Sequence, residues 1–521
     1  MSAKASTGPG SAGGPPPPSY GAGEICDICG GELVWGADSA RAAGAAYDSR
    51  RTGPGQLFFA VTGERTDGHL YLAEAGAAGA TVFVVGRWDG SIAGPFAAWA
   101  EGRDVVGGGA GPALAVIKVD DPTLAVGKLA AHHRRRYNIP VIGITGSMGK
   151  TTAKDMTAHI VEGRYQSLVS AGNLNSHISL PIVLLQLAPS HQLAVLEMAA
   201  RLHGDSHYLA ELAEPATGVL TSVAGVHLET LGSLAGVAKT KAELLRALPA
   251  TGLGIYPADS EPLRHELAVR PPEAQLISFG TGPDADVRFG EPVTAFRREG
   301  DAATAGIAFK ITCRPGPAAE RLDLPVNQQL SASLPYPGPH NAGNVIAAAL
   351  AAASVGVPFA SGLASLAGFR PKSEMRLDIQ SLEDLLVIDD TYNASPLAMV
   401  AALKILAQAA AGGRQVAVLA DMLELGPTEA EEHLALGRRV AGQGVDLLVT
   451  YGRAAEGIGR GAIDAGMPPD RVLHAASHDA VVEVLERHLV PGDAVLVKGS
   501  RGMAMENVVA ALRAVWRRRA T

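Results

Sequence analysis

The chain has 521 residues, of which 47% are hydrophobic, and a formal net charge of −8. This length predicts about three domains, and the acidic balance argues against nucleic acid or a membrane surface as a general partner. The sequence has no uninterrupted run of about 18 apolar residues and no N-terminal signal pattern, so we expect no membrane span. Three cysteines in so long a chain fit a reducing cytoplasm.

The N-terminal part of the chain divides into a tail and a small domain. Residues 1–22 are rich in Gly, Pro, Ser and Ala, and we expect them to be disordered. Residues 23–137 contain the apolar runs LFFAVTG, ATVFVVG and ALAVIKV between Ala-rich helical stretches, which predicts an α/β domain. Its CxxC, Cys26 and Cys29, is either a pair of ordinary thiols or part of a metal or redox site. The basic cluster at 132–138 is either a linker or the solvated end of a helix.

Residues 138–364 form a predicted central domain that opens with a glycine-rich turn. The buried run NIPVIGIT leads into GITGSMGKTT at 143–152, and a helix is expected to follow. The glycines allow several backbone N–H groups and the helix N-terminus to face one anion. Lys150 would then reach the β- and γ-phosphates of ATP or GTP, and the Thr151 hydroxyl would bind Mg²⁺. The common phosphate loop has Gly where this chain has Ile144, and the alternative is an ordinary glycine-rich turn between strand and helix.

Further strands of this domain end in residues that could bind a cation. Glu197 ends the run LAVLE and His227 follows TSVAGV, and ligands gather at the carboxyl ends of strands in open α/β sheets. Each could instead be structural, but with the loop they predict a Mg²⁺ site. Lys239 and Lys241 lie in a helical pattern, where a solvated face is the simplest interpretation. The stretch 280–335 looks strand-poor, an insertion or β-excursion, and 341–356 predicts a closing helix.

Residues 365–521 show a second alternation of strands and helices. LLVIDDTY, QVAVLADM, DLLVTYG and DAVLVKGS predict a Rossmann-like sheet, without the GxGxxG of a dinucleotide site. DDTYNASP at 389–396 could hold a ribose or could be a simple turn, and the cationic strand end at 498–501 could face a carboxylate or phosphate. The predicted fold class is therefore α/β, with three domains in series: a small α/β domain, a central P-loop ATPase-like parallel sheet and a C-terminal Rossmann-like sheet.

From about residue 24 to its end the chain resembles the Mur ligases, ATP-dependent amide-forming enzymes of peptidoglycan assembly. The order and spacing of many short motifs carry the resemblance, since coincident motifs mislead far less than single ones. These motifs are YDSRRTGPGQLFFAVTGERTDGH (47–69), TGSMGKTT (145–152), GNLN (172–175), LEM (196–198), VHLETLGS (226–233), AKTKAEL (238–244), GPHNAGN (338–344), DDTYNASP (389–396), ADMLELG (420–426) and KGSRGMAME (498–506). Within the family the chain is most similar to the members that add D-alanyl-D-alanine to UDP-N-acetylmuramoyl-tripeptide.

The resemblance implies a role for each matching residue, and it implies ATP and two Mg²⁺ ions. The implied nucleotide contacts are Gly146, Ser147, Gly149, Lys150, Thr151, Thr152, Asn341 at the adenine, Arg376 near the phosphates, Asp390 and Asn393. The implied metal ligands are Thr151, Glu197, His227 and a carbamylated Lys241, which overturns the solvated-face interpretation of that lysine. The implied catalytic residues are Lys150, His227 and Lys241. The implied substrate contacts are Ser49, Arg50, Asp67 and His69 in a UDP-sugar-binding N-terminal domain, Asn173 and Asn175, and Lys498, Ser500 and Arg501 facing the incoming amine in the C-terminal domain.

The implied reaction joins a UDP-muramoyl-peptide-like acid to a dipeptide-like amine, both small molecules, in a protein we expect to be monomeric. Two segments depart from the family pattern: Ser176 to Ser179 replaces Asn-Glu-Ile-Gly, and Ala199 to Asp205 replaces a glycine-rich loop. Both should line the acyl-substrate side. They leave open a related ATP-dependent amide ligase with another acid or amine, as in specialised metabolism. A non-catalytic ATP-binding scaffold is a more remote alternative.

Overall fold

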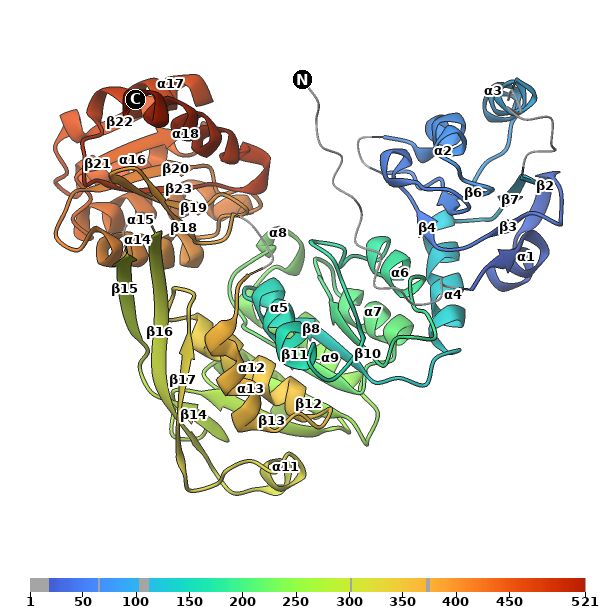
Figure 1. The fold of residues 1–521 in the computed structure, drawn as a ribbon, viewed down its shortest axis with the longest axis horizontal. Coiled ribbons are helices and arrows are strands. Elements are labelled where there is room, and N and C mark those ends of the chain that lie inside the picture. Colours follow the sequence, from blue (N-terminus) through green and yellow to red (C-terminus); the bar gives the residue numbers. More distant parts are fainter. Residues whose placement is uncertain (1–17, 64–65, 103–111, 300–301, 372–374, 521) are drawn as a thin grey trace.

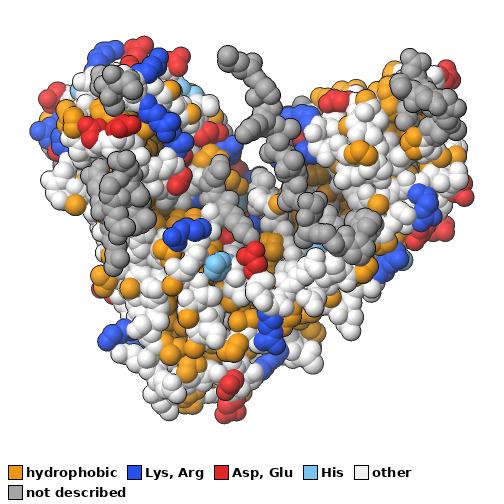
Figure 2. All heavy atoms as spheres, viewed as in Figure 1, with side chains coloured by type: hydrophobic (Ala, Val, Ile, Leu, Met, Phe, Trp, Pro, Cys, Tyr) orange, Lys and Arg blue, Asp and Glu red, His pale blue; other side chains and the backbone are white. Residues whose placement is uncertain are grey.

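The structure is a computed structural model that describes residues 18–63, 66–102, 112–299, 302–371 and 375–520. It consists of α/β domains in series, with the N-terminal and C-terminal domains at opposite ends of the central domain (Figure 1). On the visible face, basic and acidic side chains are interspersed over the outer domains (Figure 2). None of the helices in these ranges combines the length and apolarity that a bilayer crossing needs. The predicted α/β fold class with its three units is confirmed.

The N-terminal domain is built on a mostly parallel sheet with strand order β2-β7-β6-β5-β4, in which only β2 runs antiparallel to its neighbour. The strands are β2 (Glu32–Gly36), β4 (Ala45–Ala46), β5 (Leu57–Phe59), β6 (Val82–Val85) and β7 (Ala115–Lys118), and a small ribbon pairs β1 (Tyr20–Gly21) with β3 (Arg41–Ala42). The helices are α1 (Ala22–Cys29), α2 (Leu72–Ala77), α3 (Gly90–Glu101), α4 (Pro122–Arg134) and the short 3₁₀ turns η1 (Ser49–Arg51) and η2 (Gly68–Tyr71). The three predicted apolar runs became β5, β6 and β7.

The end of the predicted tail belongs to the folded domain. Most of that segment, residues 1–17, lies outside the described residues. Tyr20, however, is buried, and its hydroxyl lies 2.6 Å from Nδ1 of His133. An aromatic ring with a polar partner for its hydroxyl contributes substantial buried area, which explains why Tyr20 packs as part of the folded domain.

The basic cluster at 132–138 is neither an open linker nor a fully solvated helix end. His133 and Arg134, in the last turn of α4, are buried. The Arg134 guanidinium donates to the carbonyl oxygens of Ala213 (2.8 Å), Tyr137 (2.6 Å) and Ile139 (3.0 Å). A buried guanidinium needs such partners for its donors. One apolar core therefore continues from the N-terminal domain into the central domain.

The central domain contains a large sheet with order β15-β16-β14-β13-β12-β11-β8-β10-β9, and β17 pairs with β16. Its strands are β8 (Val141–Thr145), β9 (Ser167–Val169), β10 (Leu193–Glu197), β11 (Thr217–Leu220), β12 (Leu253–Pro257), β13 (Gln275–Gly280), β14 (Val287–Phe289), β15 (Val293–Glu299), β16 (Ala302–Cys313) and β17 (Gln329–Leu334). Its helices are α5 (Lys150–Val161), α6 (Ser179–Leu184), α7 (Asp205–Ala213), α8 (Leu228–Leu231), α9 (Leu234–Arg246), α10 (Glu261–Val269), α11 (Pro317–Arg321), α12 (Asn341–Ala353), α13 (Phe359–Ser365) and the turn η3 (Leu366–Gly368).

The prediction that 280–335 is strand-poor is wrong, although a β-excursion is present. The segment holds β14 to β17, and β15 and β16 form a long antiparallel hairpin. Its strands mix Thr, Ala and charged residues on exposed positions, so they lack the continuous apolar run that marks a fully buried parallel strand. The predicted boundary at residue 364 falls inside α13, which packs with α12.

The C-terminal domain has strand order β18-β19-β23-β20-β21-β22, parallel except for β18. Its strands are β18 (Asp378–Leu382), β19 (Leu385–Asp390), β20 (Gln415–Ala420), β21 (Leu447–Tyr451), β22 (Val472–Ala475) and β23 (Ala494–Lys498). Its helices are α14 (Pro396–Ala410), α15 (Glu429–Gly442), α16 (Glu456–Asp464), α17 (His478–His488), α18 (Glu506–Ala520) and the turns η4 (Gly426–Thr428), η5 (Pro469–Arg471) and η6 (Arg501–Met503). The four predicted strands are β19, β20, β21 and β23.

Candidate active site

Three neighbouring parallel strands bring the central-domain candidates to one edge of the sheet. β8 lies between β10 and β11, with Glu197 opposite Ile144 and Leu220 opposite Thr145. The glycine-rich loop after β8, Glu197 at the end of β10 and the segment after β11 therefore emerge side by side. This is the edge where open α/β sheets bind their ligands.

The glycine-rich loop is shaped by contacts that only glycine tolerates. Gly149 has φ +80°, and a Cβ there would lie 2.4 Å from Oδ1 of Asn344 on α12. Gly146 has φ +146°, and its Cβ would lie 2.1 Å from Thr221 Oγ1. Both positions demand a residue without a side chain. The loop then enters α5 at Lys150, so the helix N-terminus faces the same space as the loop.

Lys150 is half-buried, and its amine donates to backbone carbonyl groups of the loop. Its Nζ donates to the carbonyl oxygens of Gly146 (2.7 Å) and Ser147 (3.3 Å). Burial lowers the pKa of Lys150, while the nearby Glu197 opposes that shift. A cation held by carbonyl groups beside a helix N-terminus gives a strong local attraction for a polyanion.

Glu197 is a buried carboxylate with unused acceptor capacity. Its Oε1 accepts from Asn175 Nδ2 at 2.7 Å, whereas Oε2 is buried without a hydrogen-bond partner among the described residues. The burial cost of such an oxygen is offset when a cation binds it. Thr151 is also buried, and its hydroxyl accepts from Arg376 Nη2 at 3.3 Å. This donor set fits a hard divalent cation.

Lys241 is fully buried, contrary to the solvated-face interpretation. It lies on α9 with 1% of its surface exposed, and its Nζ donates to the carbonyl oxygen of Ala200 at 2.9 Å. Burial and the charge of Lys150 lower the pKa of Lys241 to about 7. A large fraction of this amine is therefore neutral and nucleophilic at physiological pH. Lys239 lies exposed on the same helix.

His227 lies at the N-terminus of α8 and contacts the C-terminal domain. Its backbone is left-handed, with φ 53°, and its Nδ1 lies 3.0 Å from Oε2 of Glu424. No cluster of three or more His, Cys, Asp or Glu side chains suited to a metal occurs in the described ranges. Cys26 and Cys29 do not form a disulfide. The four predicted cation ligands, Glu197, His227, Thr151 and a carbamylated Lys241, lie on or next to four different helices and strands.

Two of the predicted C-terminal contacts form a buried pair at the ends of the neighbouring strands β19 and β23. Lys498 Nζ lies 2.6 Å from Asp390 Oδ2 and donates to the carbonyl oxygen of Asn393 at 2.8 Å. Lys498 is 2% exposed. Asp390 and Lys498, predicted for the nucleotide and the amine, are therefore partners of each other.

Two predicted residues near this pair differ in exposure. Ser500 is buried, and its Oγ accepts from the backbone N–H of Leu423 at 2.9 Å. Arg501 is exposed and pairs with Glu506 at 2.7 Å. Of these two residues, Arg501 offers an exposed charge to a ligand, although that charge is paired with Glu506.

Asn341, the predicted adenine contact, is buried and hydrogen-bonded within the protein. Asn341 is 1% exposed, and its Nδ2 donates to the carbonyl oxygen of Pro337 at 2.7 Å. Its Oδ1 accepts from Asn344 at 2.9 Å, and Asn344 in turn lies under Gly149. In the structure Asn341 supports the loop through Asn344.

The predicted uridine-side residues lie apart from this edge, in the N-terminal domain. His69 is buried; its Nδ1 donates to Asp67 Oδ1 at 2.6 Å and its Nε2 accepts from the N–H of Gly86 at 2.9 Å. Burial opposes ionisation of Asp67, but hydrogen bonds from His69 and Arg87 lower its pKa to about 2. A cavity of about 400 Å³ opens beside His69 and Arg87.

The other predicted residues of this group differ in exposure. Ser49 is buried in η1, while Arg50 is exposed and pairs with Asp48 at 2.7 Å. In the central domain Asn173 is exposed, and Thr152 lies half-buried in the first turn of α5.

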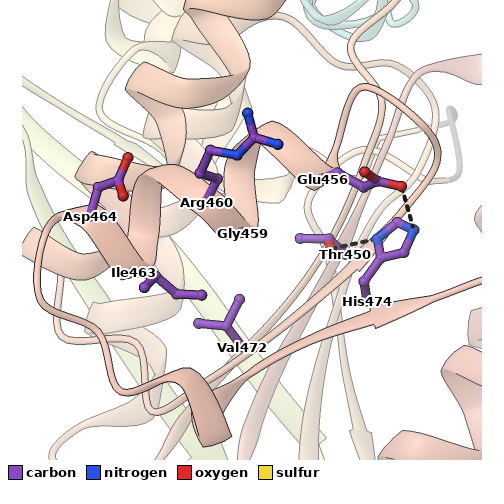
Figure 3. Close-up of a pocket in the computed structure, with 8 residues that line it drawn as sticks. All are labelled: Thr450, Glu456, Gly459, Arg460, Ile463, Asp464, Val472 and His474. Atoms are coloured by element: carbon purple, nitrogen blue, oxygen red, sulfur yellow. Dashed lines mark hydrogen bonds and ion pairs between the residues drawn. The ribbon is translucent and has the colours of Figure 1, made fainter.

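A second cavity, of about 410 Å³, lies at the outer edge of the C-terminal sheet (Figure 3). His474 on β22 contacts Thr450 Oγ1 through Nδ1 (3.0 Å) and Glu456 Oε1 through Nε2 (3.7 Å). Ile463 and Val472 form its apolar wall. None of the predicted site residues lines it, so it is separate from the loop.

Comparison with known families covers most of the chain. Residues 42–134 match the Mur ligase family catalytic domain, residues 144–352 the Mur ligase middle domain, and residues 375–501 the Mur ligase glutamate ligase domain. The UDP-N-acetylmuramoyl-tripeptide–D-alanyl-D-alanine ligase of Bacillus subtilis is 31% identical over 89% of this chain and 92% of its own. The chain belongs to the Mur ligase family.

Two further proteins place this Mur ligase within its family. The ligase of the same name from Escherichia coli is 32% identical over 94% of this chain and 97% of its own. A crystal structure of MurF from Acinetobacter baumannii has a TM-score of 0.78 and 27% identity, covering 96% of this chain and 100% of that one. The shared architecture thus extends over all three domains.

The structure of this Mur ligase also brings together the two segments that we expect to depart from the family pattern. His177 Nδ1 lies 3.8 Å from Asp205 Oδ1, and the backbone N–H of Ala199 donates at 2.8 Å to the carbonyl oxygen of Asn175, the residue before the first segment. Lys241 contacts Ala200. The departures therefore form one structural unit beside Glu197 and Lys241.

Sequence reasoning missed several residues that shape the site. Ser222 binds the loop twice: its carbonyl oxygen accepts from Ser147 N–H and its Oγ from Met148 N–H, both at 2.9 Å. Tyr392 was not among the predicted site residues, and the predicted Arg376 stacks over its ring at 3.9 Å. The Ser222 contact could have been predicted from the sequence Thr-Ser-Val that follows β11. A hydroxyl side chain directly after a parallel strand lies at the edge of the sheet where ligands bind. The stacking of Arg376 on Tyr392 joins two residues that are separated in sequence by the antiparallel strands β18 and β19.

Proposed function

We propose that this Mur ligase couples ATP cleavage to amide formation, joining D-alanyl-D-alanine to UDP-N-acetylmuramoyl-tripeptide in the synthesis of a peptidoglycan precursor. The observation that carries the proposal is the convergence of the loop, Lys150, Glu197 and Lys241 at one sheet edge. Relatives that carry this activity in their names match nearly the whole chain. The setting would be the cytoplasm, where ATP and UDP-linked substrates occur.

In the proposed reaction, a carboxylate oxygen of the acid forms a bond to the γ-phosphorus and the bond to ADP breaks. The amine of the dipeptide then attacks the acyl carbon, phosphate leaves with the C–O bond electrons, and the nitrogen loses a proton. The first step brings two anions together, the carboxylate and the γ-phosphate, and in the second step negative charge develops on the acyl oxygen beside the phosphate, so cationic groups are required. Lys150 and the α5 N-terminus would hold the phosphates, and Arg376 would reach the same space through its contact with Thr151.

Mg²⁺ would be held by Glu197, Thr151, His227 and Lys241. The unpartnered, buried Glu197 Oε2 supports this assignment among the described residues. The lowered pKa of Lys241 favours reaction of its neutral amine with CO₂, which would turn the lysine into an anionic ligand. When bound, the ions would neutralise charge on the transferring phosphoryl group.

Two experiments test this mechanism. With ¹⁸O in the acid's carboxylate, one ¹⁸O should appear in the released phosphate; phosphate free of ¹⁸O would reject the acyl phosphate. Lys241→Ala should lose most ADP formation and recover part of it with a short-chain carboxylic acid. Full activity of Lys241→Ala without added carboxylic acid would contradict a functional carbamate at Lys241.

A related ligase with another acid or amine is the second candidate. The contact between His177 and Asp205 supports this candidate, because it joins the two segments that we expect to differ from the family pattern and to line the acyl-substrate side. A panel of acids and amines, read by phosphate release, separates the two. Dependence on UDP-N-acetylmuramoyl-tripeptide and D-alanyl-D-alanine supports the first candidate, whereas turnover only with another pair supports the second.

A further inference from the structure

Glu424 connects the C-terminal domain with the candidate metal site. It lies in the segment between β20 and η4, and its carboxylate meets two central-domain side chains. Oε2 lies 3.0 Å from His227 Nδ1, and Oε1 lies 3.6 Å from Arg201 Nη2. In Figure 1, α8, which begins next to His227, lies between the central sheet and the C-terminal domain.

The segment that carries Glu424 is fixed from within its own domain. The N–H of Leu423 donates to Ser500 Oγ, and the N–H of Met422 donates to Nε2 of the buried His433, both at 2.9 Å. These bonds leave the carboxylate little freedom to move independently of the domain. The position of the whole C-terminal domain therefore decides whether Glu424 reaches His227.

The backbone supports the same conclusion. Glu424 has φ 64° and His227 has φ 53°, so both partners are in the left-handed region, which is costly for residues other than glycine. Gly426, two residues on, would place a Cβ 2.8 Å from Glu229 Cγ of α8. The two domains thus meet closely at this point, and Glu424 and His227 both have left-handed backbone conformations there.

The geometry has a specific chemical consequence for the imidazole. A hydrogen bond from Nδ1–H to a carboxylate fixes the ring orientation and leaves Nε2 as the nitrogen with a lone pair. Histidines that bind metals commonly have such a carboxylate partner, which orients the ring and strengthens the ligand. Glu424 would supply this partner from another domain.

We propose that Glu424 is a positioning residue that orients His227 toward a divalent cation, so that this cation site is complete only when the C-terminal domain docks on α8. The inference rests on the proposed function, in which His227 binds a cation. By reciprocity, the cation should in turn favour the docked arrangement. Arg201, from the segment Ala199 to Asp205, adds an exposed and therefore weaker contact to the same carboxylate.

Mn²⁺ binding to the full-length protein tests the inference without an activity readout. Free Mn²⁺ is followed by electron paramagnetic resonance during titration of the wild type, His227→Ala, Glu424→Ala and Glu424→Gln. Glu431→Ala is the matched control, since Glu431 is exposed on α15 of the same domain. Loss of an outer carboxylate partner typically costs about 10- to 100-fold in metal affinity. We expect a loss of about 10-fold for Glu424→Ala, a smaller loss for Glu424→Gln, whose amide oxygen still accepts, and none for Glu431→Ala.

The outcomes separate this inference from the proposed function. If His227→Ala weakens Mn²⁺ binding and both Glu424 variants bind like the wild type, Glu424 is not a positioning residue and the metal site stands. If His227→Ala binds Mn²⁺ like the wild type, the assignment of His227 fails, and the inference fails with it. If Glu424→Ala does not fold, as judged by thermal unfolding, Glu424→Gln carries the test, because it preserves size and one acceptor.

Discussion

The guanidinium of Arg376 donates to the hydroxyl of Thr151 at 3.3 Å, which links the start of the C-terminal domain to the first turn of the loop's helix. The same guanidinium stacks on Tyr392 at 3.9 Å, and its Nε is buried without a hydrogen-bond partner among the described residues. A charged donor with spare capacity beside a phosphate loop is suited to bind a phosphate oxygen.

We therefore expect Arg376→Ala to weaken ATP binding by about 10- to 100-fold, since hydrogen bonds to charged groups contribute about 1.5–3 kcal/mol. Calorimetric titration with a non-hydrolysable ATP analogue measures this. Arg460→Ala, on the outer edge of the C-terminal domain, is the control. Equal affinity of the Arg376 variant and the wild type would contradict the assignment.

Gly149→Ala should damage the loop through geometry alone. Its φ of +80° and the 2.4 Å approach of a Cβ to Asn344 Oδ1 both oppose any side chain, and the left-handed conformation itself costs about 1–2 kcal/mol. We expect weaker nucleotide binding and a lower melting temperature. Gly163→Ala, with no atom within 4 Å of its Cβ, should change neither. A wild-type nucleotide affinity in Gly149→Ala would show that the loop does not hold the nucleotide.

Stability should depend on pH through Lys241. Its pKa is about 7 in the folded protein and about 10.4 in an unfolded chain. Between these values the unfolded chain binds the extra proton, so the free energy of unfolding rises with pH. The penalty of burying the charged amine is present in full below pH 7 and disappears as the pH approaches 10.4.

We expect Lys241→Met, in bicarbonate-free buffer, to be more stable than the wild type by on the order of 4 kcal/mol near neutral pH, with the gain shrinking toward pH 10. Urea unfolding at several pH values measures the difference. A difference that does not change with pH would mean that Lys241 is not buried as a titrating amine. Lys239→Met, exposed on the same helix, should show no such trend.

The sequence predicted the strands that carry the site because they are continuous apolar runs ending in polar residues. LAVLE became β10 with Glu197 at its end, and DAVLVKGS became β23 with Lys498 at its end. Parallel neighbours then place such ends on one edge. The hairpin β15–β16 was missed because half-exposed strands alternate polar and apolar residues and resemble irregular segments.

Contacts between distant segments could not be predicted in the same way. Lys241 is buried because α9 packs against the segment that contains Ala200. The helical pattern alone favoured a solvent-exposed position for this lysine. The pairing of Asp390 with Lys498 joins residues 108 positions apart, on neighbouring strands β19 and β23. Strand order is a tertiary property, and the family resemblance assigned Asp390 to the nucleotide and Lys498 to the amine, so their pairing was not predicted.

ADP formation by the purified protein, with UDP-N-acetylmuramoyl-tripeptide and D-alanyl-D-alanine each omitted in turn, tests the central claim most directly. We predict ADP and a UDP-linked pentapeptide, detected by mass spectrometry, only when both are present with ATP, and neither product from Lys150→Ala. Sustained turnover by Lys150→Ala, or no ADP and no pentapeptide from the wild type with the complete mixture, would contradict the account.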